Sequence, residues 1–253
     1  MPSSIIIGET ELSLVKENVY KIETSKLILD SINDNMEQHN IDINISSHTS
    51  GLAKKRAHPH GNIEAEIKAS SIMPLTKFLL KKENKQGVSF DVILHFIGNI
   101  GNQLTFLKNQ GFSIPFFSLE DIVVIDEIVF AFVNNEKVFK IENDSASRRS
   151  NIITIDYPII YDEDTSFIQP NIGFCDSQSE REREQDMKLP IYIHFSAAFY
   201  SLAQISVYVF LRKKIKDEED YEKEASPFIY TSLYWCLKRC LDKDENKRIL
   251  LYV

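Results

Sequence analysis

Cysteine and histidine are the side chains that most readily bind metal ions, and two groups of them lie close together in this sequence. Cys236 and Cys240 are four residues apart in an apolar stretch with helical spacing, which places both on one helix face. No further cysteine or nearby histidine completes a metal set around them. His48, His58 and His60 lie in a basic segment interrupted by Gly and Pro, and they offer either a metal or anion site or an exposed connector. We predict buried reduced thiols, an exposed connecting loop and no metal.

The composition indicates a packed core beneath an acidic surface. The chain has 253 residues, of which 43% are hydrophobic, and this length suits one large or two small domains. The net charge of −8 disfavours nucleic acid as a partner, because acidic surfaces and phosphate backbones repel each other. No apolar run reaches membrane-spanning length, and the start of the chain lacks the basic residues and cleavage site of a signal peptide. We therefore expect a cytoplasmic protein without a nucleic-acid or membrane partner.

The first third of the chain predicts a small β-rich unit that carries one helix. Thr24 or Ser25 can cap that helix, because a side-chain hydroxyl accepts from the free N–H groups of the first turn. Pro74 interrupts a later apolar run and is expected to start a short helix. The predicted elements are, in order, strands at Ser4–Gly8, Leu12–Val15 and Val19–Ile22, a helix over Ser25–His39, and strands at Ile41–Ile45 and Ile63–Ile67.

From residue 89 onward the apolar residues recur every three or four positions, which is typical of helices. Gly111 is expected to end a first long helix, and Gly98 and Gly101 within it indicate close packing against a neighbour. A hairpin follows, with strands at Ile122–Ile125 and Ile128–Val133. The remaining prediction comprises an irregular stretch from about 134 to 190, an apolar helical segment at Tyr192–Leu211, a charged run at Arg212–Glu224 and an amphipathic helix at Ser226–Leu241.

Four segments of the second part carry motifs: SLEDIVV at 118–124, TSFIQPN at 165–171, FYSLA at 199–203 and LKRCLDKDENKRI at 237–249. In this order they resemble the end of the catalytic loop, the end of the activation segment, the core helix and the closing signature of the eukaryotic-type protein kinase superfamily. Glu120 matches the glutamate of the catalytic loop, and Asp121 takes the position of its asparagine. Asp244 and Arg248 match the closing signature.

The resemblance implies an α+β, protein-kinase-like fold of two lobes. A small β-rich N-lobe would span residues 1–73, and a mainly helical C-lobe would span residues 74–253. Large DNA viruses carry many degenerate kinase-like proteins, and the richness in Ile, Asn and Lys is typical of an AT-rich genome. The expected location is therefore the cytoplasm, which is that of the host cell if the source is viral.

The resemblance also locates the catalytic positions, and most of them have lost the residue that phosphoryl transfer needs. The His-Arg-Asp triplet of the family falls on Ile114–Phe116, so the aspartate base is absent. The lysine that usually follows is Ser118. The metal-binding aspartate of the Asp-Phe-Gly motif falls on Ala131 or Asn134, according to the register. No catalytic residue is therefore predicted.

The nucleotide-binding positions have likewise lost some of the residues that the family uses there. A phosphate-binding loop uses glycines so that backbone N–H groups can approach the ligand, and here Gly8 is alone. Lys21 stands where the phosphate-binding lysine belongs, with Glu37 or Asp34 as its expected partner, or it is an outward residue of its strand. Asp121 can still offer oxygen to Mg²⁺. A vestigial site would comprise Gly8, Lys21, Asp121 and Asn134, and neither ATP nor Mg²⁺ is predicted as a cofactor.

Two structural positions of the family have changed as well. The aspartate of the core helix, which braces the catalytic loop, is Ala198. The glutamate that pairs with the arginine at Arg248 is Asn171, so an ion pair is replaced by at most a hydrogen bond. Phe116 and Phe117 then serve as packing residues.

Three hypotheses about function follow. The first is a pseudokinase that acts through a protein partner, with an active kinase among the candidate partners. The second is a divergent active kinase that transfers phosphate from ATP to Ser or Thr, using Asp121, Lys21 and an acid such as Glu120 or Asp144. The third is a structural or interaction protein outside the kinase superfamily.

Overall fold

The chain folds into two compact units, and each unit is made of three segments that are not consecutive in the sequence. The computed structural model describes residues 4–49, 62–144, 149–157, 160–161, 166–167, 175–176, 189–215 and 218–248. The first unit contains Met1–Lys85, Phe90–Leu107 and Glu120–Glu136. The second contains Gln86–Ser89, Lys108–Leu119 and Lys137–Val253. The fold is α+β, and each unit is described below by itself.

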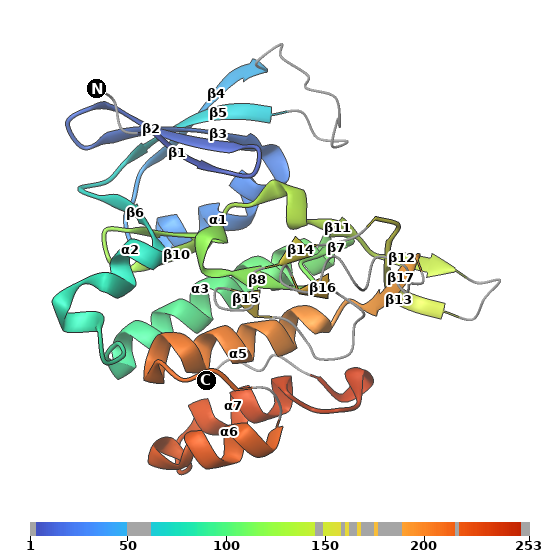
Figure 1. Cartoon of the computed structure of the whole chain (residues 1–253). Helices are drawn as coiled ribbons and strands as arrows, with labels where there is room; N and C mark the ends of the chain where they lie inside the picture. The colour runs from blue at the N-terminus through green and yellow to red at the C-terminus, as the bar shows by residue number, and fades with distance from the viewer. Residues whose placement is uncertain are drawn as a thin grey trace. The chain divides into compact units, whose positions relative to one another are not determined.

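The first unit is built on a five-stranded antiparallel sheet with the strand order β1-β2-β3-β5-β4 (Figure 1). Each of the five strands predicted in this part of the chain is present, and most run further than we expected. The strands are β1 (Ser4–Ile7), β2 (Thr10–Lys16), β3 (Val19–Ser25), β4 (Ile43–Thr49) and β5 (Asn62–Lys68).

Helix α1 (Lys26–Gln38) follows β3 directly, as predicted. Ser25 is its N-cap, because the Ser25 hydroxyl accepts a hydrogen bond of 3.3 Å from the Ile28 N–H. The buried face of α1 includes Leu29, Ile32 and Met36, which recur at the spacing of one helix face. The cap and the apolar spacing together fix where the helix begins and which side it buries.

A second sheet of the first unit has the order β10-β9-β6 and consists of β6 (Ile72–Pro74), β9 (Ile122–Ile125) and β10 (Val129–Phe132). The predicted hairpin is confirmed: β9 pairs antiparallel with β10. Its turn residues Asp126 and Glu127 have φ angles of 49° and 63°, the left-handed conformation of a tight hairpin turn. The predicted short helix is α2 (Leu75–Leu80), which starts immediately after Pro74.

Helix α3 (Phe90–Asn109) is the long helix predicted before Gly111. The close packing expected at Gly98 is wrong, because an added Cβ there would meet no heavy atom within 4 Å. Side-chain amides attach α3 to β10 instead. Gln103 Nε2 donates to the Phe132 carbonyl at 2.7 Å, while the Phe132 N–H donates to Gln103 Oε1 at 2.9 Å. The Phe130 N–H donates to Asn99 Oδ1 at 3.0 Å.

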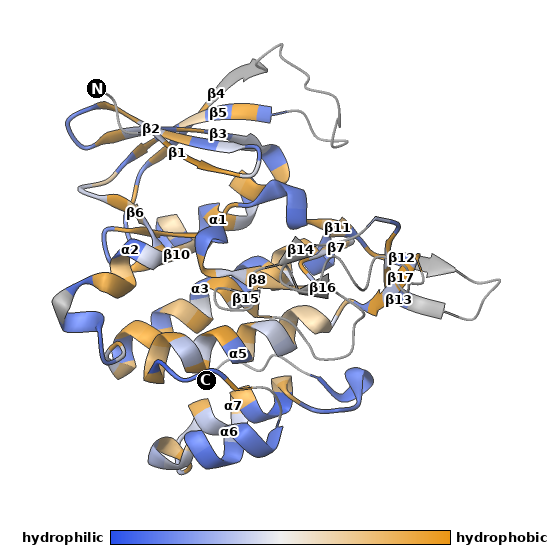
Figure 2. Cartoon of the chain, in the orientation of Figure 1, coloured by the Kyte–Doolittle hydropathy of each residue, from blue (hydrophilic) through white to orange (hydrophobic). Residues whose placement is uncertain are grey.

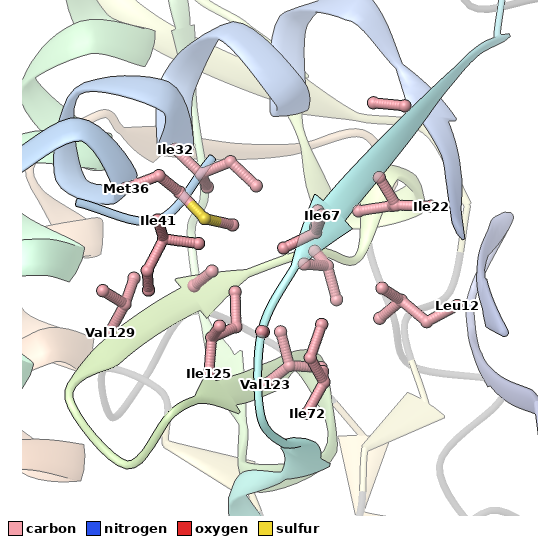
Figure 3. Close-up of a cluster of buried hydrophobic side chains, with 14 of the residues drawn as sticks. Leu12, Ile22, Ile32, Met36, Ile41, Ile67, Ile72, Val123, Ile125 and Val129 are labelled. Carbon is pink, nitrogen blue, oxygen red and sulfur yellow. The ribbon is translucent and has the colours of Figure 1, made fainter. Parts of the chain in front are cut away.

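The core of the first unit lies between the five-stranded sheet, α1 and the β9–β10 hairpin. Figure 3 shows side chains of α1, β5 and the hairpin pointing toward one another, with Met36 beside Ile41 and Ile32. Burial of these aliphatic side chains is the main stabilising contribution, at about 25 cal/mol per Å² of apolar surface. The same core holds β9 in place, and β9 begins directly after Asp121.

The second unit contains a sheet that the sequence did not reveal. Its order is β12-β13-β17, from β12 (Glu142–Asp144), β13 (Arg149–Ile155) and β17 (Ile191–His194). The irregular stretch expected from about 134 to 190 is therefore wrong at β13. Ile153 and Ile155 are buried there, so the strand is stabilised by an apolar core rather than by a local turn signal. The short strands of this unit are β7 (Phe112–Ser113), β8 (Phe117–Ser118), β11 (Phe139–Lys140), β14 (Ile160–Tyr161), β15 (Ser166–Phe167) and β16 (Cys175–Asp176).

Two helix predictions in the second unit need correction. The apolar segment from Tyr192 contains the end of β17 before α5 (Ala197–Leu211) begins. The helix predicted over Ser226–Leu241 is interrupted: a 3-10 turn at Ser226–Phe228 precedes α7 (Ser232–Cys240). Thr231 separates the two, because its hydroxyl caps α7. The charged run contains α6 (Glu218–Glu224), which is mostly hydrophilic in Figure 2.

Two further expectations concern the cysteines of α7 and whether a helix could span a membrane. Cys236 and Cys240 are buried reduced thiols, as predicted. None of the helices described here is both long and apolar enough to cross a membrane.

Candidate functional site

Three of the four residues predicted for a vestigial nucleotide site lie together in the first unit. Asn134 Nδ2 donates a hydrogen bond of 2.7 Å to Asp121 Oδ1, and both side chains are buried. Gly8, in the turn between β1 and β2, has a φ of +55°, and a Cβ on it would lie only 2.3 Å from Asn134 Oδ1. The β1–β2 turn therefore rests directly on the Asn134 amide. We call Gly8, Asp121 and Asn134 the polar cluster.

Strands β2 and β3 hold the segment that follows β10. Thr10 Oγ1 donates to the Val133 carbonyl at 2.6 Å and shares a hydrogen bond of 2.7 Å with Thr24 Oγ1. The Val133 N–H donates to the Asp121 carbonyl at 2.9 Å. Strands β2 and β3 and the residue before β9 thus fix the backbone that presents Asn134.

Hydrogen bonds also hold the next two residues, Asn135 and Glu136. The Glu136 N–H donates to Asn134 Oδ1 at 3.1 Å, which uses the oxygen of the amide whose nitrogen already binds Asp121. Ser25 Oγ donates to Asn135 Oδ1 at 2.8 Å. Asn135 Nδ2 is buried and has no hydrogen-bond partner among the residues that the structure describes. An unsatisfied buried donor costs about 1–3 kcal/mol, so the surrounding contacts must offset this cost.

Lys21 does not join the polar cluster. Alternate residues of β3 face opposite sides of the sheet, and Ile22 is part of the core next to α1. Lys21 therefore faces away from α1, and its Nζ lies 2.7 Å from Glu64 Oε1 on β5. The expected pairing with Glu37 or Asp34 is wrong. The hydrogen bond to Glu64 is the main cause that raises the pKa of Lys21 above its ordinary value.

The sheet face that carries Lys21 is acidic. Glu11, Glu23 and Glu64 stand directly opposite one another across β2, β3 and β5, and Glu66 is opposite Lys21. Like charges in such positions repel each other, and the ammonium of Lys21 offsets part of that repulsion. The arrangement explains Lys21 as a neutralising residue among carboxylates. A polyphosphate would be repelled by this face.

The position expected to lack a catalytic base belongs to the second unit and is apolar. Phe116 is 2% exposed and packs with Ile153, Ile155, Ile191 and Ile193, while Phe117 is fully buried. The expectation that both phenylalanines are packing residues is confirmed. We call Phe116 and the four isoleucines the apolar cluster.

A lysine from another segment reaches the end of this loop. Lys137 Nζ donates to Ser118 Oγ at 2.8 Å and lies 4.7 Å from the centre of the Phe116 ring. Ser118 Oγ is also 3.0 Å from Ser166 Oγ, because β8 pairs antiparallel with β15. Sequence reasoning did not find Lys137 or Ser166 as neighbours of Ser118. They are 19 and 48 positions away, and no local pattern marks such contacts.

The loop that contains Phe116 is hydrogen-bonded to α5 one turn beyond Ala198. Ser201 Oγ donates to the Pro115 carbonyl at 3.1 Å, and Ala198 is buried without a polar group. Arg248 donates through Nε to the Asp242 carbonyl at 2.7 Å and lies 4.9 Å from the Tyr200 ring. Burial is the main cause that lowers the pKa of Arg248.

Several predicted features lie outside the described residues: Gln169–Asn171, His58, His60, and the side chains of His48 and Asp144. Within the described part of the chain, no three His, Cys, Asp or Glu residues are grouped so that they could hold a metal ion. The chain matches no protein-family model, and no curated protein is significantly similar to it.

Proposed function

We propose that this protein is a pseudokinase, a protein of kinase-like fold that has lost phosphoryl transfer and acts by binding a protein partner in the cytoplasm. An active kinase is a candidate partner. The observation that supports this most is the polar cluster. Asp121 and Asn134 are hydrogen-bonded to each other, with the β1–β2 turn against them, and the resemblance places Mg²⁺ at Asp121 and at either Asn134 or Ala131.

The polar cluster does not fit a magnesium ion. Mg²⁺ takes near-octahedral oxygen ligands at about 2.0–2.1 Å, commonly with one or two carboxylates among them. Here a single carboxylate oxygen receives an amide N–H, and the amide oxygen receives the Glu136 N–H. An ion would have to break buried hydrogen bonds, each of which contributes about 1 kcal/mol. The contact with Gly8 also leaves no room for a larger group on that side.

The other two chemical requirements are also unmet. The core-facing residues of β3 are Tyr20, Ile22 and Thr24, so that face of the strand offers no cation to a phosphate. The resemblance places the base at Phe116, which is inside the apolar cluster and has no carboxylate, although the ammonium of Lys137 lies 4.7 Å from its ring. These losses support a binding role rather than phosphoryl transfer.

The decisive test measures Mg-ATP binding by thermal unfolding. A ligand at 100 times its Kd stabilises a protein by about 2.7 kcal/mol, which shifts the melting temperature by several degrees. We expect no Mg-dependent shift, and Asp121→Asn should respond to Mg-ATP as the wild type does. A shift that requires Mg²⁺ and disappears in Asp121→Asn would contradict the proposal.

One observation favours a divergent active kinase as the second candidate. The ammonium of Lys137 lies 2.8 Å from the hydroxyl of Ser118, where the resemblance implies a lysine. An assay for phosphate transfer from ATP to a generic Ser/Thr substrate separates the candidates. Transfer by the wild type that is abolished in Lys137→Met would establish the second candidate, and absence of transfer in both supports the first.

A further inference from the structure

Helices α1 and α3 of the first unit contact each other along a row of polar side chains. Gln103 Nε2 donates a hydrogen bond of 2.9 Å to Ser31 Oγ. One turn further along α1, Asn35 Nδ2 donates to the Asn99 carbonyl at 2.9 Å, and Asn102 Nδ2 donates to Asn35 Oδ1 at 2.9 Å. The residue numbers rise along α1 while they fall along α3, so the two helices run in opposite directions at this contact.

The next pair of residues in this row consists of two histidines. His39 follows Asn35 by four residues, and His95 precedes Asn99 by four residues, which is about one helix turn in each case. The two ring centres are 5.2 Å apart, and the ring planes meet at 69°. His39 is half-buried and His95 is exposed. We call His39 and His95 the histidine pair.

The backbone that carries the histidine pair is fixed on both helices. The His39 N–H donates to the Met36 carbonyl at 3.1 Å, and the Met36 side chain is buried in the core of the first unit. On α3, Asn99 Oδ1 accepts from the Phe130 N–H at 3.0 Å, which attaches the helix to β10 one turn beyond His95. Two ligands on anchored elements lose little entropy when an ion binds between them.

No contact within the described part of the chain competes for the ring nitrogens. Neither imidazole of the histidine pair forms a hydrogen bond or an ion pair with the residues that the structure describes. His194 differs, because its Nδ1 lies 2.8 Å from Ser196 Oγ. A ring nitrogen that accepts no hydrogen bond keeps its lone pair for a metal ion.

The distance between the two rings suits a tetrahedral metal ion. In such a site the nitrogens lie about 2.0–2.1 Å from Zn²⁺, which places the centres of two imidazole rings about 5 Å apart. The 5.2 Å between the ring centres of His39 and His95 agrees with this value. The χ2 torsion of histidine is broad, so the exposed His95 ring can turn a nitrogen toward an ion that it shares with His39.

We propose that the histidine pair binds a divalent first-row transition metal ion such as Zn²⁺, which would connect the end of α1 to α3. Imidazole nitrogen suits Zn²⁺, Cu²⁺ and Ni²⁺, whereas Mg²⁺ and Ca²⁺ prefer oxygen ligands. Among the described residues no third His, Cys, Asp or Glu completes the set, so water would fill the remaining positions and binding would be weaker than in a structural zinc site. The inference goes beyond the proposed function and uses no residue of the polar cluster.

Isothermal titration calorimetry with ZnCl₂ provides the test, at about pH 8 where histidines are neutral and able to bind metal. We expect saturable binding of one ion per chain in the wild type. His39→Gln and His95→Gln should each raise the apparent Kd by about tenfold or more, because each removes one of the two protein ligands. In EDTA both variants should melt like the wild type, which checks that they fold.

The matched control is the triple variant His48→Gln, His58→Gln and His60→Gln, which removes the histidines of the basic segment and leaves the histidine pair intact. It should bind Zn²⁺ as the wild type does. Amide hydrogen exchange gives a second readout. Zn²⁺ should slow exchange at the end of α1 in the wild type and not in His95→Gln, because the ion joins α1 to α3.

No saturable binding, an unaltered Kd in either single variant, or loss of binding in the triple variant would overturn the inference. Unchanged exchange at the end of α1 in saturating Zn²⁺ would also overturn it, because no ion would then join the two helices. Failure here leaves the Mg-ATP test untouched, since Mg²⁺ prefers oxygen ligands. Mg-dependent ATP binding together with intact zinc binding would refute only the proposed loss of activity.

Discussion

The polar cluster and the apolar cluster, which the resemblance assigns to the metal and to the base, are built in physically different ways. In the polar cluster, side chains that can still bind a metal satisfy one another through buried hydrogen bonds. In the apolar cluster, Phe116, at the position that the resemblance assigns to the base, is part of a hydrophobic core, and the ammonium of Lys137 lies 4.7 Å from the centre of its ring. A hydrogen-bonded cluster can exchange partners at a cost of about 1 kcal/mol per bond, whereas a carboxylate placed among isoleucines loses its hydration and recovers only part of that cost from Lys137. We therefore expect the polar cluster to accept a changed residue more readily than the apolar cluster.

The largest expected effect tests the apolar side of this comparison. Phe116→Ala should lower the free energy of unfolding by about 3–5 kcal/mol, because it removes a fully packed ring from the core. Phe116→Asp should also destabilise, because the carboxylate would be buried among isoleucines and the ammonium of Lys137 would offset only part of that cost. Urea unfolding followed by circular dichroism measures both. Phe90→Ala, at a 39% exposed phenylalanine, is the control and should cost much less.

The next prediction tests whether the polar cluster can be reopened. Asn134→Asp would place two carboxylates where Nδ2 and Oδ1 are now 2.7 Å apart. Repulsion should destabilise the variant by about 2–3 kcal/mol at pH 7 and raise the pKa of the carboxyl pair. The raised pKa means that the loss is present above that pKa and disappears as the pH falls and the pair takes up a proton.

Magnesium gives the second readout of Asn134→Asp. If the cluster is reopened, Mg²⁺ should restore stability to the variant and leave the wild type unchanged, as measured by urea unfolding with and without the ion. Gln38→Glu makes the same amide-to-carboxylate change at an exposed residue of α1 and should show neither effect. A variant that ignores both pH and Mg²⁺ would remove the claimed difference between the two clusters.

A smaller effect is expected at Gly8. Gly8→Ala combines a positive φ with a Cβ 2.3 Å from Asn134 Oδ1, so we expect a loss of about 1–3 kcal/mol. Gly98→Ala, where an added Cβ meets nothing within 4 Å, should instead stabilise α3 by about 0.5–1 kcal/mol. Thermal unfolding measures both. Adding Asn134→Ala to Gly8→Ala should recover the part of the loss that comes from the contact, and additive losses would show that no contact exists.

The smallest effect is expected at Lys21. Lys21→Met should change stability by less than about 1 kcal/mol, since exposed ion pairs contribute little. Because the folded-state pKa of Lys21 is raised, this contribution should be complete below the ordinary pKa of lysine and be lost as the pH rises through the raised value. Chemical unfolding at neutral and alkaline pH measures it. A large effect at neutral pH, or Mg-ATP binding that needs Lys21, would place this residue in a site after all.

Local signals in the sequence were sufficient for much of the first unit. The hydroxyl of Ser25 before an amphipathic run marked the start of α1, and two β-branched runs around Asp126-Glu127 marked the β9–β10 hairpin. The face of Lys21 could not be decided in this way, because one position of shift in a strand reverses every side chain. Only the contacts of Ile22 with the core settled it.

The second unit was harder to predict because its contacts join distant segments. Strand β13 is stabilised because Ile153 and Ile155 pack on Phe116. The residues near β13 in the sequence do not predict this contact. The continuous apolar pattern after Tyr192 concealed the boundary between β17 and α5, since a buried strand and a buried helix are alike in composition. The neighbours of Ser118 were missed for the same reason, because Lys137 approaches it from another part of the chain.

The amides of α3 have a consequence for association between molecules. Strand β10 ends its sheet, and its sequence VFAF is of the kind that recruits a strand from another chain through open backbone groups. Asn99 and Gln103 occupy the N–H groups of Phe130 and Phe132 and the carbonyl of Phe132. Two side chains of a helix thus occupy three backbone groups of this edge, and they make an apolar strand less open to pairing with another chain without the addition of another strand.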